Sequence, residues 1–282
     1  MKLLRFGEIG REKPGLLDKD GQVRDLSAHV KDITGDILSP DGLKRLAAIN
    51  AGELPRVPSG VRMGAPVTGF NKLVAIGLNY ADHAAEAGMQ LPTEPIFFLK
   101  ALTSVCGPDD NVEKPRGSTK LDWEVEIAAI IGTRAKYVSE ADALNHVAGY
   151  CVCNDVSERN FQIERGGTWT KGKSHDTFGP LGPFLATKDE VANVQNLSMW
   201  LDVNGKRRQT GSTSTMIFPI AKCVSYVSQF LTLLPGDIIT TGTPPGVGTG
   251  MKPPQFLNVG DVVTLGIEAL GEQRQEIVAA GE

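Results

Sequence analysis

The sequence predicts a mostly β protein of the α+β class, with a rolled or barrel-like main domain and a small N-terminal α/β unit. Short apolar segments punctuated by glycine and proline recur along the chain, as is typical of β-strands. Helical patterns are few and do not alternate regularly with the strands, which argues against a doubly wound sheet or an α/β barrel. At 282 residues the chain is long enough for one large domain with a small appendage.

Residues 1–60 form the small N-terminal unit in this interpretation, and residues 61–282 form the main domain. The proline- and glycine-rich segment Glu53–Gly60 is the expected linker between them. The predicted elements of the N-terminal unit are strands at Lys2–Phe6, Gly15–Leu17 and Val23–Leu26, and a helix at Pro40–Ile49.

The main domain is expected to contain at least seven strands and three helices. The predicted strands are Lys72–Ile76, Ile96–Leu99, Glu124–Ile131, Val147–Cys153, Ser198–Val203, Asp237–Thr240 and Val262–Ile267. The predicted helices are Ser139–Leu144, Ser157–Arg165 and Pro219–Leu231. The last of these has a proline at its start and apolar residues that repeat with helical spacing.

Composition and charge exclude several classes of function. The net charge of -4 is nearly balanced and there is no basic tract, so neither a nucleic acid nor an anionic membrane is an expected partner. No apolar stretch approaches the roughly 20 residues of a membrane span, and the segment Met1–Gly7 is too short and polar for a signal peptide. We therefore expect a cytoplasmic protein, whose four cysteines are reduced core thiols.

Acidic residues alternate in the segment Asp122–Gly132, which otherwise has the pattern of a buried strand. Side chains repeat every two residues along a strand, so Glu124 and Glu126, with Asp122, are predicted to share one face. Such close like charges require either water or a cation, and the apolar run that follows favours a core. Asp155 ends a second apolar strand and can complete the site. Oxygen ligands without His or Cys favour Mg²⁺, Mn²⁺ or Ca²⁺ over zinc. A solvated strand face with an unrelated turn aspartate is the alternative.

His83 and Glu86 follow the strand at Lys72–Ile76, on what the pattern predicts to be a short helix. Residues three apart are neighbours on one helix face. A carboxylate beside an imidazole fixes its tautomer and raises its basicity, which suits the deprotonation of a water molecule. The alternative is a solvated helix with an incidental His–Glu contact.

Two further segments offer groups that bind anions. Lys171 and Lys173 lie in a glycine- and proline-rich loop beside His175, and a lysine fixed near a metal can stabilise an enolate or pair with a substrate carboxylate. The strand at Asp237–Thr240 runs into a glycine-rich turn that lacks the Gly-Lys-Ser/Thr ending of a nucleotide-binding loop. Its amides and the Thr243 hydroxyl can hold a small carboxylate. Surface lysines and an ordinary tight turn are the alternatives.

Five motifs that occur in order between about residues 70 and 250 make the chain resemble the fumarylacetoacetate hydrolase family. They are Asn79-Tyr80-x-x-His83-x-x-Glu86, Asp122-Trp123-Glu124-x-Glu126, Asn154-Asp155-Val156-Ser157-x-Arg159-Asn160-x-Gln162, Trp169-Thr170-x-x-Lys173-Ser174-x-Asp176 and Thr241-Gly242-Thr243-Pro244-x-Gly246-Val247-Gly248. The resemblance implies a β-roll main domain, a homodimer, and Mg²⁺ or a similar ion bound by Glu124, Glu126 and Asp155.

The same resemblance implies roles for six other residues. His83 and Glu86 become a water-activating dyad, Lys173 the residue that stabilises the enolate, and Arg159, Gln162 and Thr243 substrate contacts. The chain departs from the family pattern at His175, where an aromatic residue is most frequent.

Family substrates share a 2-oxo acid, often a 2,4-dioxo acid, so the resemblance implies a small 2-oxo acid as the partner. Our first choice is a metal-dependent hydrolase that cleaves the C3–C4 bond and releases pyruvate. The small N-terminal unit and overall length are similar to bacterial hydrolases of 2,4-diketo-3-deoxy-L-fuconate and L-rhamnonate. Acylpyruvate hydrolase, oxaloacetate decarboxylase, dioate isomerase/decarboxylase and ureidoglycolate lyase are the rival enzymes. The His–Glu pair argues against a non-catalytic oxo-acid binder.

Overall fold

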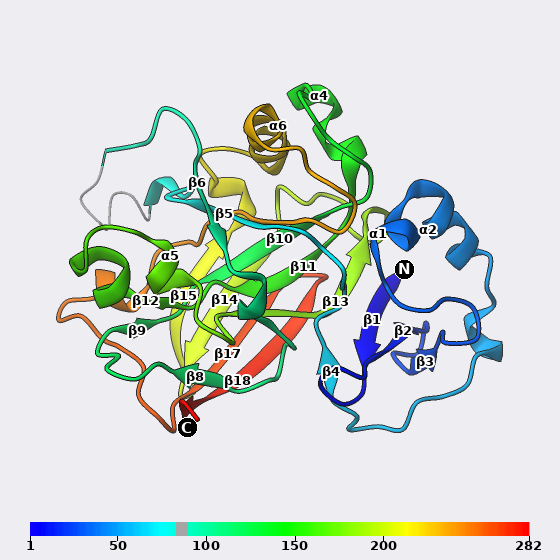
Figure 1. Cartoon of the computed structure of the whole chain (residues 1–282), viewed down its shortest axis with the longest axis horizontal. Coiled ribbons are helices and arrows are strands. Elements are labelled where there is room, and N and C mark those ends of the chain that lie inside the picture. The colour runs from blue at the N-terminus through cyan, green and yellow to red at the C-terminus, as the bar shows by residue number, and fades with distance from the viewer. Residues whose placement is uncertain (83–89, 282) are drawn as a thin grey trace.

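Strands greatly outnumber helices in the computed structural model, which describes residues 1–82 and 90–281 (Figure 1). The mostly β, α+β class predicted from the sequence is therefore confirmed. Within the described residues the largest sheet has eleven strands. Nine of them follow in the order β3 (Val23–Asp25), β2 (Lys13–Leu17), β1 (Lys2–Phe6), β13 (Gly179–Thr187), β11 (Val147–Asn154), β10 (Val125–Ile131), β16 (Ile238–Thr240), β5 (Leu73–Gly77) and β6 (Ile96–Lys100). The other two are β4 (Met63–Gly64), paired with β1, and β7 (Val105–Cys106), paired with β13.

A second sheet packs against the main one, and short helices lie around both. The second sheet has the order β15 (Lys206–Ser212), β14 (Ser198–Val203), β17 (Val262–Ile267), β18 (Gly271–Ala279) and β8 (Val112–Lys114). A two-stranded sheet joins β12 (Ser157–Glu158) to β9 (Leu121–Asp122). The described α-helices are α1 (Gly35–Leu38), α2 (Pro40–Ala47), α4 (Glu140–Ala143), α5 (Thr170–Lys173) and α6 (Ile220–Phe230).

Strand β10 is central to the packing, because both of its faces are buried. Val125, Ile127 and Ala129 belong to the core between the two sheets, together with residues of β14, β17 and α6. Ala128 and Ile130 point the other way, into a second core shared with the N-terminal segment. Since alternate side chains of a strand point to opposite faces, a strand covered on both sides has a continuous apolar sequence.

The N-terminal segment continues the main sheet. Leu3 of β1 pairs with Leu185 of β13, and β1, β2 and β3 form an antiparallel meander at the right of Figure 1. Helix α2 begins at a proline, is capped by the Ser39 side chain, and buries Leu46 in the second core. The division into domains at residue 60 stays a prediction.

One helix assignment in the sequence analysis was right only in part, and one loop assignment was wrong. The helix expected at Ser157–Arg165 is strand β12 followed by a π-helical turn at Asn160–Glu164. The loop expected around Lys173 is helix α5, and strand β13 begins soon after it at Gly179. The prolines in this segment favour a loop on local grounds, but β13 gains partners on both sides from β1 and β11, which are distant in sequence.

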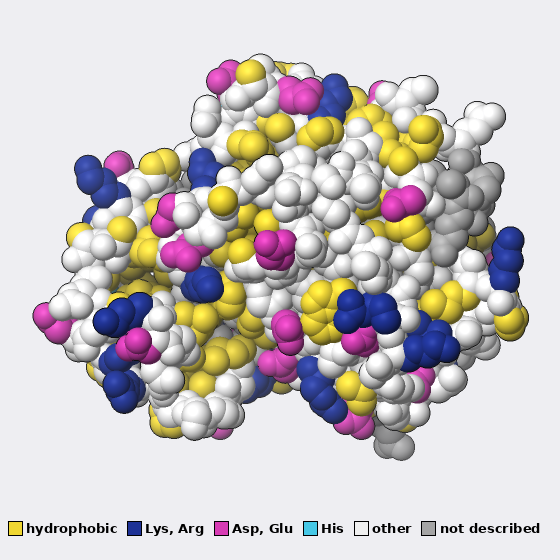
Figure 2. Space-filling view, turned by 180° about the vertical axis from the view of Figure 1, so that it is seen from behind, with side chains coloured by type: hydrophobic (Ala, Val, Ile, Leu, Met, Phe, Trp, Pro, Cys, Tyr) yellow, Lys and Arg dark blue, Asp and Glu magenta, His cyan; other side chains and the backbone are white. Residues whose placement is uncertain are grey.

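None of the described helices is long and apolar enough to cross a membrane. On the face drawn in Figure 2, Lys and Arg side chains are interspersed with Asp and Glu side chains, as the balanced composition leads one to expect. The four cysteines are free thiols, and burial raises the pKa of Cys151.

Asp237 ties the start of β16 to the start of β5, and its loss should destabilise the fold. One carboxylate oxygen accepts from the backbone of Asn71 and Lys72 (2.9 Å each), and the other accepts from Leu234 N (2.7 Å) and Lys72 Nζ (2.7 Å). In Asp237→Asn an NH₂ group faces donors, so we expect the free energy of unfolding to fall by about 2–4 kcal/mol. Chemical denaturation measures this. The same substitution at exposed Asp20 should change stability by less than about 0.5 kcal/mol, and equal effects would contradict the assignment.

Candidate metal centre

Three carboxylates from two segments of the chain meet at one end of strands β10 and β11. Glu124, Glu126 and Asp155 are buried, and each contributes a ligand atom to a group in which all such atoms lie within 4.8 Å. The strand register brings them together, because Val125 pairs with Asn154 and Asp155 N donates to Glu124 O (2.9 Å). The structure therefore assembles the three residues that the sequence suggested as metal ligands.

Asp122 does not join this group, which corrects the expectation that it shares a face with the two glutamates. It lies on the separate strand β9, and the chain between Asp122 and Val125 does not keep the alternation of a single strand. Its carboxylate accepts from Arg159 Nε (2.8 Å), Gly248 N (2.6 Å) and Thr249 N (3.0 Å). Asp122 thus holds Arg159 and the turn after β16 in place.

Cationic side chains surround the carboxylates, although nothing basic lies within the Asp122–Glu126 motif itself. Lys173 Nζ lies 2.8 Å from Glu124 Oε2 and 2.7 Å from Asp155 Oδ2. Arg159 contacts the other oxygen of Glu124 at 2.6 Å, and Lys100 pairs with the other oxygen of Asp155. Folding therefore brings three cations to the carboxylates, from β6, α5 and the segment after β12.

The two glutamates differ in their electrostatic surroundings. Burial alone raises the pKa of Glu124, but the charges of Lys173 and Arg159 outweigh it and hold that pKa below its usual range. The pKa of Glu126 is raised, first by burial and then by the charges of Asp155 and Glu124. Burial lowers the pKa of Lys173, but the neighbouring carboxylates outweigh it and raise the pKa overall.

This donor set fits a hard divalent cation. The ligands are carboxylate oxygens, and in the described residues the group contains no His or Cys. Glu126 contacts the backbone N–H of Gly242 (2.9 Å) through one oxygen, and no cationic side chain of the described chain pairs with it. A cation beside Glu126 would offset the repulsion that raises its pKa.

A cavity of about 690 Å³ opens beside the carboxylates. The predicted substrate contacts Arg159, Gln162 and Thr243, and Lys173, all line it. Arg159 Nη1 donates to Gln162 Oε1 (3.1 Å), and Gln162 keeps its amide NH₂ for other partners. The Thr243 hydroxyl already donates to Val125 O (2.9 Å). Thr243 can therefore offer a ligand an acceptor or its backbone rather than a hydroxyl proton.

Two glycines allow the walls of the site to approach closely. A Cβ on Gly172 of α5 would lie 2.5 Å from Gln162, so glycine lets the helix that carries Lys173 pack onto the π-helical turn. Gly242 has φ +88 and no room for a Cβ against Asn79 (2.8 Å), so only glycine suits the turn that brings its N–H to Glu126. Asn79 in turn donates to Thr241 O (2.8 Å).

His83 and Glu86 lie outside the described residues, so the water-activating dyad stays a prediction. His175 packs between the rings of Phe161 and Phe178, at 5.5 and 5.2 Å between centroids. Partial burial lowers its pKa, and it is not among the described residues that line the cavity. His175, where the chain departs from the family pattern, therefore packs against two aromatic rings.

Sequence reasoning missed Lys100 and two aromatic residues of the cavity wall. Lys100 is fully buried at the end of β6, next to Asp155. A lysine that ends the apolar run at Ile96–Leu99 was the available signal. Phe98 and Trp169 make an edge-to-face contact (5.2 Å between centroids) and line the cavity beside Lys173, whose Nζ lies 5.4 Å from the Phe98 ring.

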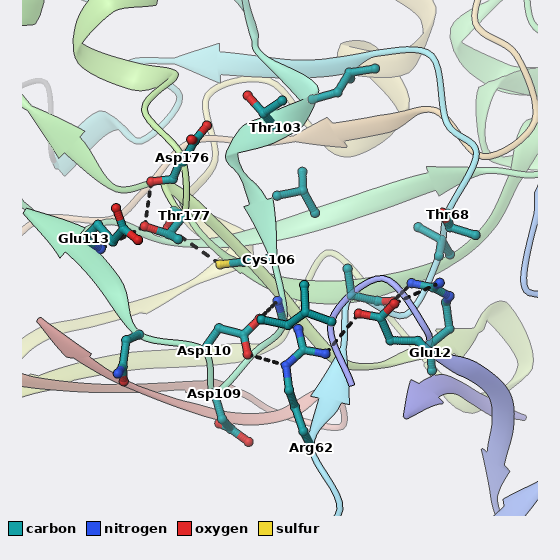
Figure 3. A pocket seen from close by; sticks show the side chains of 18 of the residues that line it. Glu12, Arg62, Thr68, Thr103, Cys106, Asp109, Asp110, Glu113, Asp176 and Thr177 are labelled. Carbon is teal, nitrogen blue, oxygen red and sulfur yellow. Dashed lines mark hydrogen bonds and ion pairs between the residues drawn. The ribbon is translucent and has the colours of Figure 1, made fainter. Parts of the chain in front are cut away.

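A second cavity, of about 920 Å³, lies between the N-terminal segment and the region around β7 (Figure 3). Its arginines are already paired: Arg62 contacts Asp110 and Glu12, and Arg5 contacts Asp32. The dashed lines in Figure 3 show Arg62 bridging these two acids. Arg62 thereby joins the N-terminal segment to the region around β7, whereas the Arg5–Asp32 pair lies within the N-terminal segment.

Comparisons with known proteins agree over most of the chain. The family profile described as "Fumarylacetoacetate (FAA) hydrolase C-terminal" matches residues 72–278. A protein of Burkholderia lata that is named a hydrolase only provisionally is 59% identical over 276 residues, which cover 98% of this chain and 98% of that protein.

Solved structures extend the similarity to proteins with named activities. Maleylpyruvate hydrolase from Sphingobium sp. SYK-6, in complex with manganese(II) ion and pyruvate, matches with a TM-score of 0.82 and 29% identity, over 100% of each chain. The 2-hydroxyhepta-2,4-diene-1,7-dioate isomerase from Mycobacterium marinum matches with a TM-score of 0.79 and 31% identity, also over 100% of each chain.

Proposed function

The chain belongs to the fumarylacetoacetate hydrolase family, and from that membership we propose that it is a metal-dependent hydrolase of 2,4-dioxo acids. In this proposal it cleaves the C3–C4 bond and releases pyruvate and a carboxylic acid. The observation that carries the proposal is the buried group Glu124, Glu126 and Asp155 at the wall of a cavity into which Lys173 also faces. The manganese and pyruvate in the related maleylpyruvate hydrolase support it.

The charge of the site suits an anionic substrate. When all four carboxylates are ionised, Asp122 included, they exceed the three cations Lys100, Arg159 and Lys173 by one negative charge. A divalent ion held by Glu124, Glu126 and Asp155, which we propose to be Mg²⁺ with Mn²⁺ or Ca²⁺ as substitutes, would supply Lewis-acid stabilisation of an enolate oxygen. The site with that ion would carry an excess positive charge, which the carboxylate of a 2-oxo acid offsets.

In the proposed reaction, each residue of the site has a defined task. His83, oriented by Glu86, takes a proton from water while the hydroxide adds to the C4 carbonyl. The C3–C4 bond then breaks, its electron pair remains on C3 as the enolate of pyruvate, and the C4 fragment leaves as a carboxylic acid. Lys173 stabilises the enolate charge, and Gln162 and Thr243 orient the substrate. The proton that His83 took from water then returns to C3, which completes the release of pyruvate and restores neutral His83.

Replacing Lys173 by methionine is expected to slow both hydrolysis of a 2,4-dioxo acid and decarboxylation of oxaloacetate by about 10²-fold, because both reactions pass through the pyruvate enolate. Release of pyruvate from each substrate measures the two rates. The exposed neighbour Lys171 provides the control, since Lys171→Met removes the same charge outside the cavity. Loss of hydrolysis with intact decarboxylation would assign Lys173 to the water instead.

The proposal also specifies the part of the substrate beyond C4. The sequence resemblance favours a 2,4-diketo-3-deoxy sugar acid, such as the L-fuconate or L-rhamnonate derivative. The decisive experiment incubates the purified protein and Mg²⁺ with a panel of 2,4-dioxo acids and oxaloacetate and follows pyruvate. We expect hydrolysis of the dioxo acids, fastest with the sugar-acid tail. Absence of pyruvate from every dioxo acid would refute the proposed function.

An isomerase or decarboxylase acting on a dioate is the second candidate, favoured by the similarity to the Mycobacterium marinum isomerase. It would use the same enolate without consuming water. Reaction in H₂¹⁸O separates the two candidates. A hydrolase incorporates ¹⁸O into the carboxylic acid formed from C4, whereas an isomerase releases no such fragment.

We also propose that the chain forms a homodimer. The end strand β6 of the main sheet exposes the apolar side chains of Ile96 (40%) and Leu99 (44%), and Leu102 (42%) follows it. An exposed apolar edge strand favours association with another chain. Sedimentation equilibrium tests this, and a monomer at micromolar concentration would contradict it. A cytoplasmic location stays a prediction.

A further inference from the structure

Gln209 connects the second sheet to the metal centre without facing the cavity. It is fully buried on strand β15 and is not among the described residues that line the cavity. Its Oε1 accepts from Val125 N (3.0 Å), and its Nε2 donates to Thr243 Oγ1 (2.8 Å) and Pro244 O (2.8 Å). One carboxamide therefore contacts both the peptide between Glu124 and Glu126 and the turn that follows β16.

These contacts close a ring of hydrogen bonds around Val125. Thr243 Oγ1, which accepts from Gln209, donates to Val125 O (2.9 Å), so both backbone groups of Val125 are satisfied. Val125 stands between Glu124 and Glu126. On the other side of the ring, Gly242 N precedes Thr243 and donates to Glu126 Oε2 (2.9 Å). The ring thus fixes the peptide between two carboxylates and the turn that contacts one of them.

The ring takes the place of strand pairing, because strand β16 ends before it reaches Val125. Strand β16 pairs with β10 only from Ala128 onward, since its last partner is Thr240. Beyond that point the backbone of β10 would lose its partners on this side, and unpaired buried backbone groups are costly. Side chains provide these hydrogen bonds instead. Thr241 Oγ1 donates to Ile127 O (3.0 Å), the Thr243 hydroxyl donates to Val125 O, and Gln209 Oε1 accepts from Val125 N. The chain after β16 is then free to turn away at Gly242.

We propose that Gln209 is a positioning residue of the metal centre. Its carboxamide holds the Val125 peptide, and so sets the separation of the Glu124 and Glu126 carboxylates that bind the ion. It does not touch substrate. This inference rests on the proposed function, because it requires that the three carboxylates bind a divalent cation.

The test measures Mn²⁺ binding and needs no substrate. Gln209→Met keeps the size of the side chain and removes all three hydrogen bonds. We expect the dissociation constant for Mn²⁺, from calorimetry, to rise by 10- to 100-fold, the range typical of residues that support metal ligands. We also expect a changed electron paramagnetic resonance spectrum of the Mn²⁺ that remains bound, because the ligand geometry is altered.

Gln195→Met is the matched control. The Gln195 amide likewise links two segments, accepting from Ile220 N (3.1 Å) and donating to Thr213 O (2.5 Å), but it does not contact the carboxylates. Both variants should unfold at lower temperature, and only Gln209→Met should weaken Mn²⁺. Wild-type Mn²⁺ affinity and spectrum in Gln209→Met, or equal weakening in Gln195→Met, would overturn the inference.

A second pair of variants keeps the test decisive if Gln209→Met does not fold. Thr243→Val removes the hydroxyl that donates to Val125 and keeps the shape, whereas Thr243→Ser retains the hydroxyl. We expect Thr243→Val to weaken Mn²⁺ binding and Thr243→Ser to leave it within about twofold; equal affinities in the two variants would contradict the ring. Failure of the wild-type protein to bind Mn²⁺ would instead refute the proposed function, and this inference with it.

Discussion

Glu126→Gln is expected to eliminate divalent-metal binding and to lower pyruvate release by about 10³-fold or more, without loss of stability. The ion is expected to supply several kcal/mol of enolate stabilisation, and each 1.36 kcal/mol is a factor of ten in rate. Burial and the charges of Asp155 and Glu124 raise the pKa of Glu126, so its ionised form is disfavoured in the folded protein. A neutral amide of the same shape removes that repulsion and can still accept from Gly242 N.

The measurements are Mn²⁺ calorimetry, thermal unfolding without added metal, and pyruvate release. The combination is informative, because a variant that merely damages the fold would lose both metal and stability. The exposed residue Glu164 supplies the control, as Glu164→Gln makes the same chemical change on the π-helical turn. Mn²⁺ affinity within twofold of the wild type in Glu126→Gln would exclude this carboxylate as a ligand.

His83→Ala is expected to lower hydrolysis of 2,4-dioxo acids by roughly 10²–10⁴-fold, the contribution of a positioned general base. Decarboxylation of oxaloacetate should fall less, since that reaction needs no activated water. Metal affinity should be nearly unchanged, because the proposed ligands are Glu124, Glu126 and Asp155. Glu86→Gln should act in the same direction with a smaller effect, because in the proposed dyad this carboxylate orients the imidazole.

The control for His83 is His29, which is exposed in the N-terminal segment. His29→Ala should retain full activity. If hydrolysis survives His83→Ala unchanged, the water is activated by another group, and the role carried over from the family to this histidine fails. Equal losses of hydrolysis and decarboxylation would indicate that His83 acts on the enolate rather than on the water.

Local pattern predicted the strands well wherever burial of alternate or continuous apolar residues defined them. Strands β1, β14 and β17 have the predicted bounds, and β10 differs by one residue. Strands β13, β15 and β18 were missed, because prolines, charged residues or weak apolar alternation hide them. For β13 the partners β1 and β11 are distant in sequence, so no local window contains them. Strands β15 and β18 instead form hairpins with their neighbours β14 and β17.

The candidate site shows the same division between local and distant information. Spacing along one strand was enough to pair Glu124 with Glu126, and the motif around Asp155 supplied the third carboxylate. The compensating charges of Lys100 and Arg159, and the Gln209 ring, depend on contacts between segments far apart in sequence. Asp122 was wrongly expected on the face of the two glutamates, because the alternation rule assumes one continuous strand. The structure instead has two strands, β9 ending at Asp122 and β10 beginning at Val125.

The pairing of β1 with β13 has a consequence for how the chain folds. The ribosome makes β1 and β2 well before β13, and these two strands can form a local hairpin at once, but Leu3 cannot meet Leu185 until synthesis has passed β13. Strand β8 waits still longer, because Val112 pairs with Ile277 near the other end. Forming such long loops costs chain entropy before the contacts that they allow can stabilise the sheet. Folding of this sheet should therefore be slow compared with that of a helical protein of similar size. The early hairpin therefore keeps an unpaired edge through most of translation, and we expect refolding from denaturant to give more aggregate as protein concentration rises.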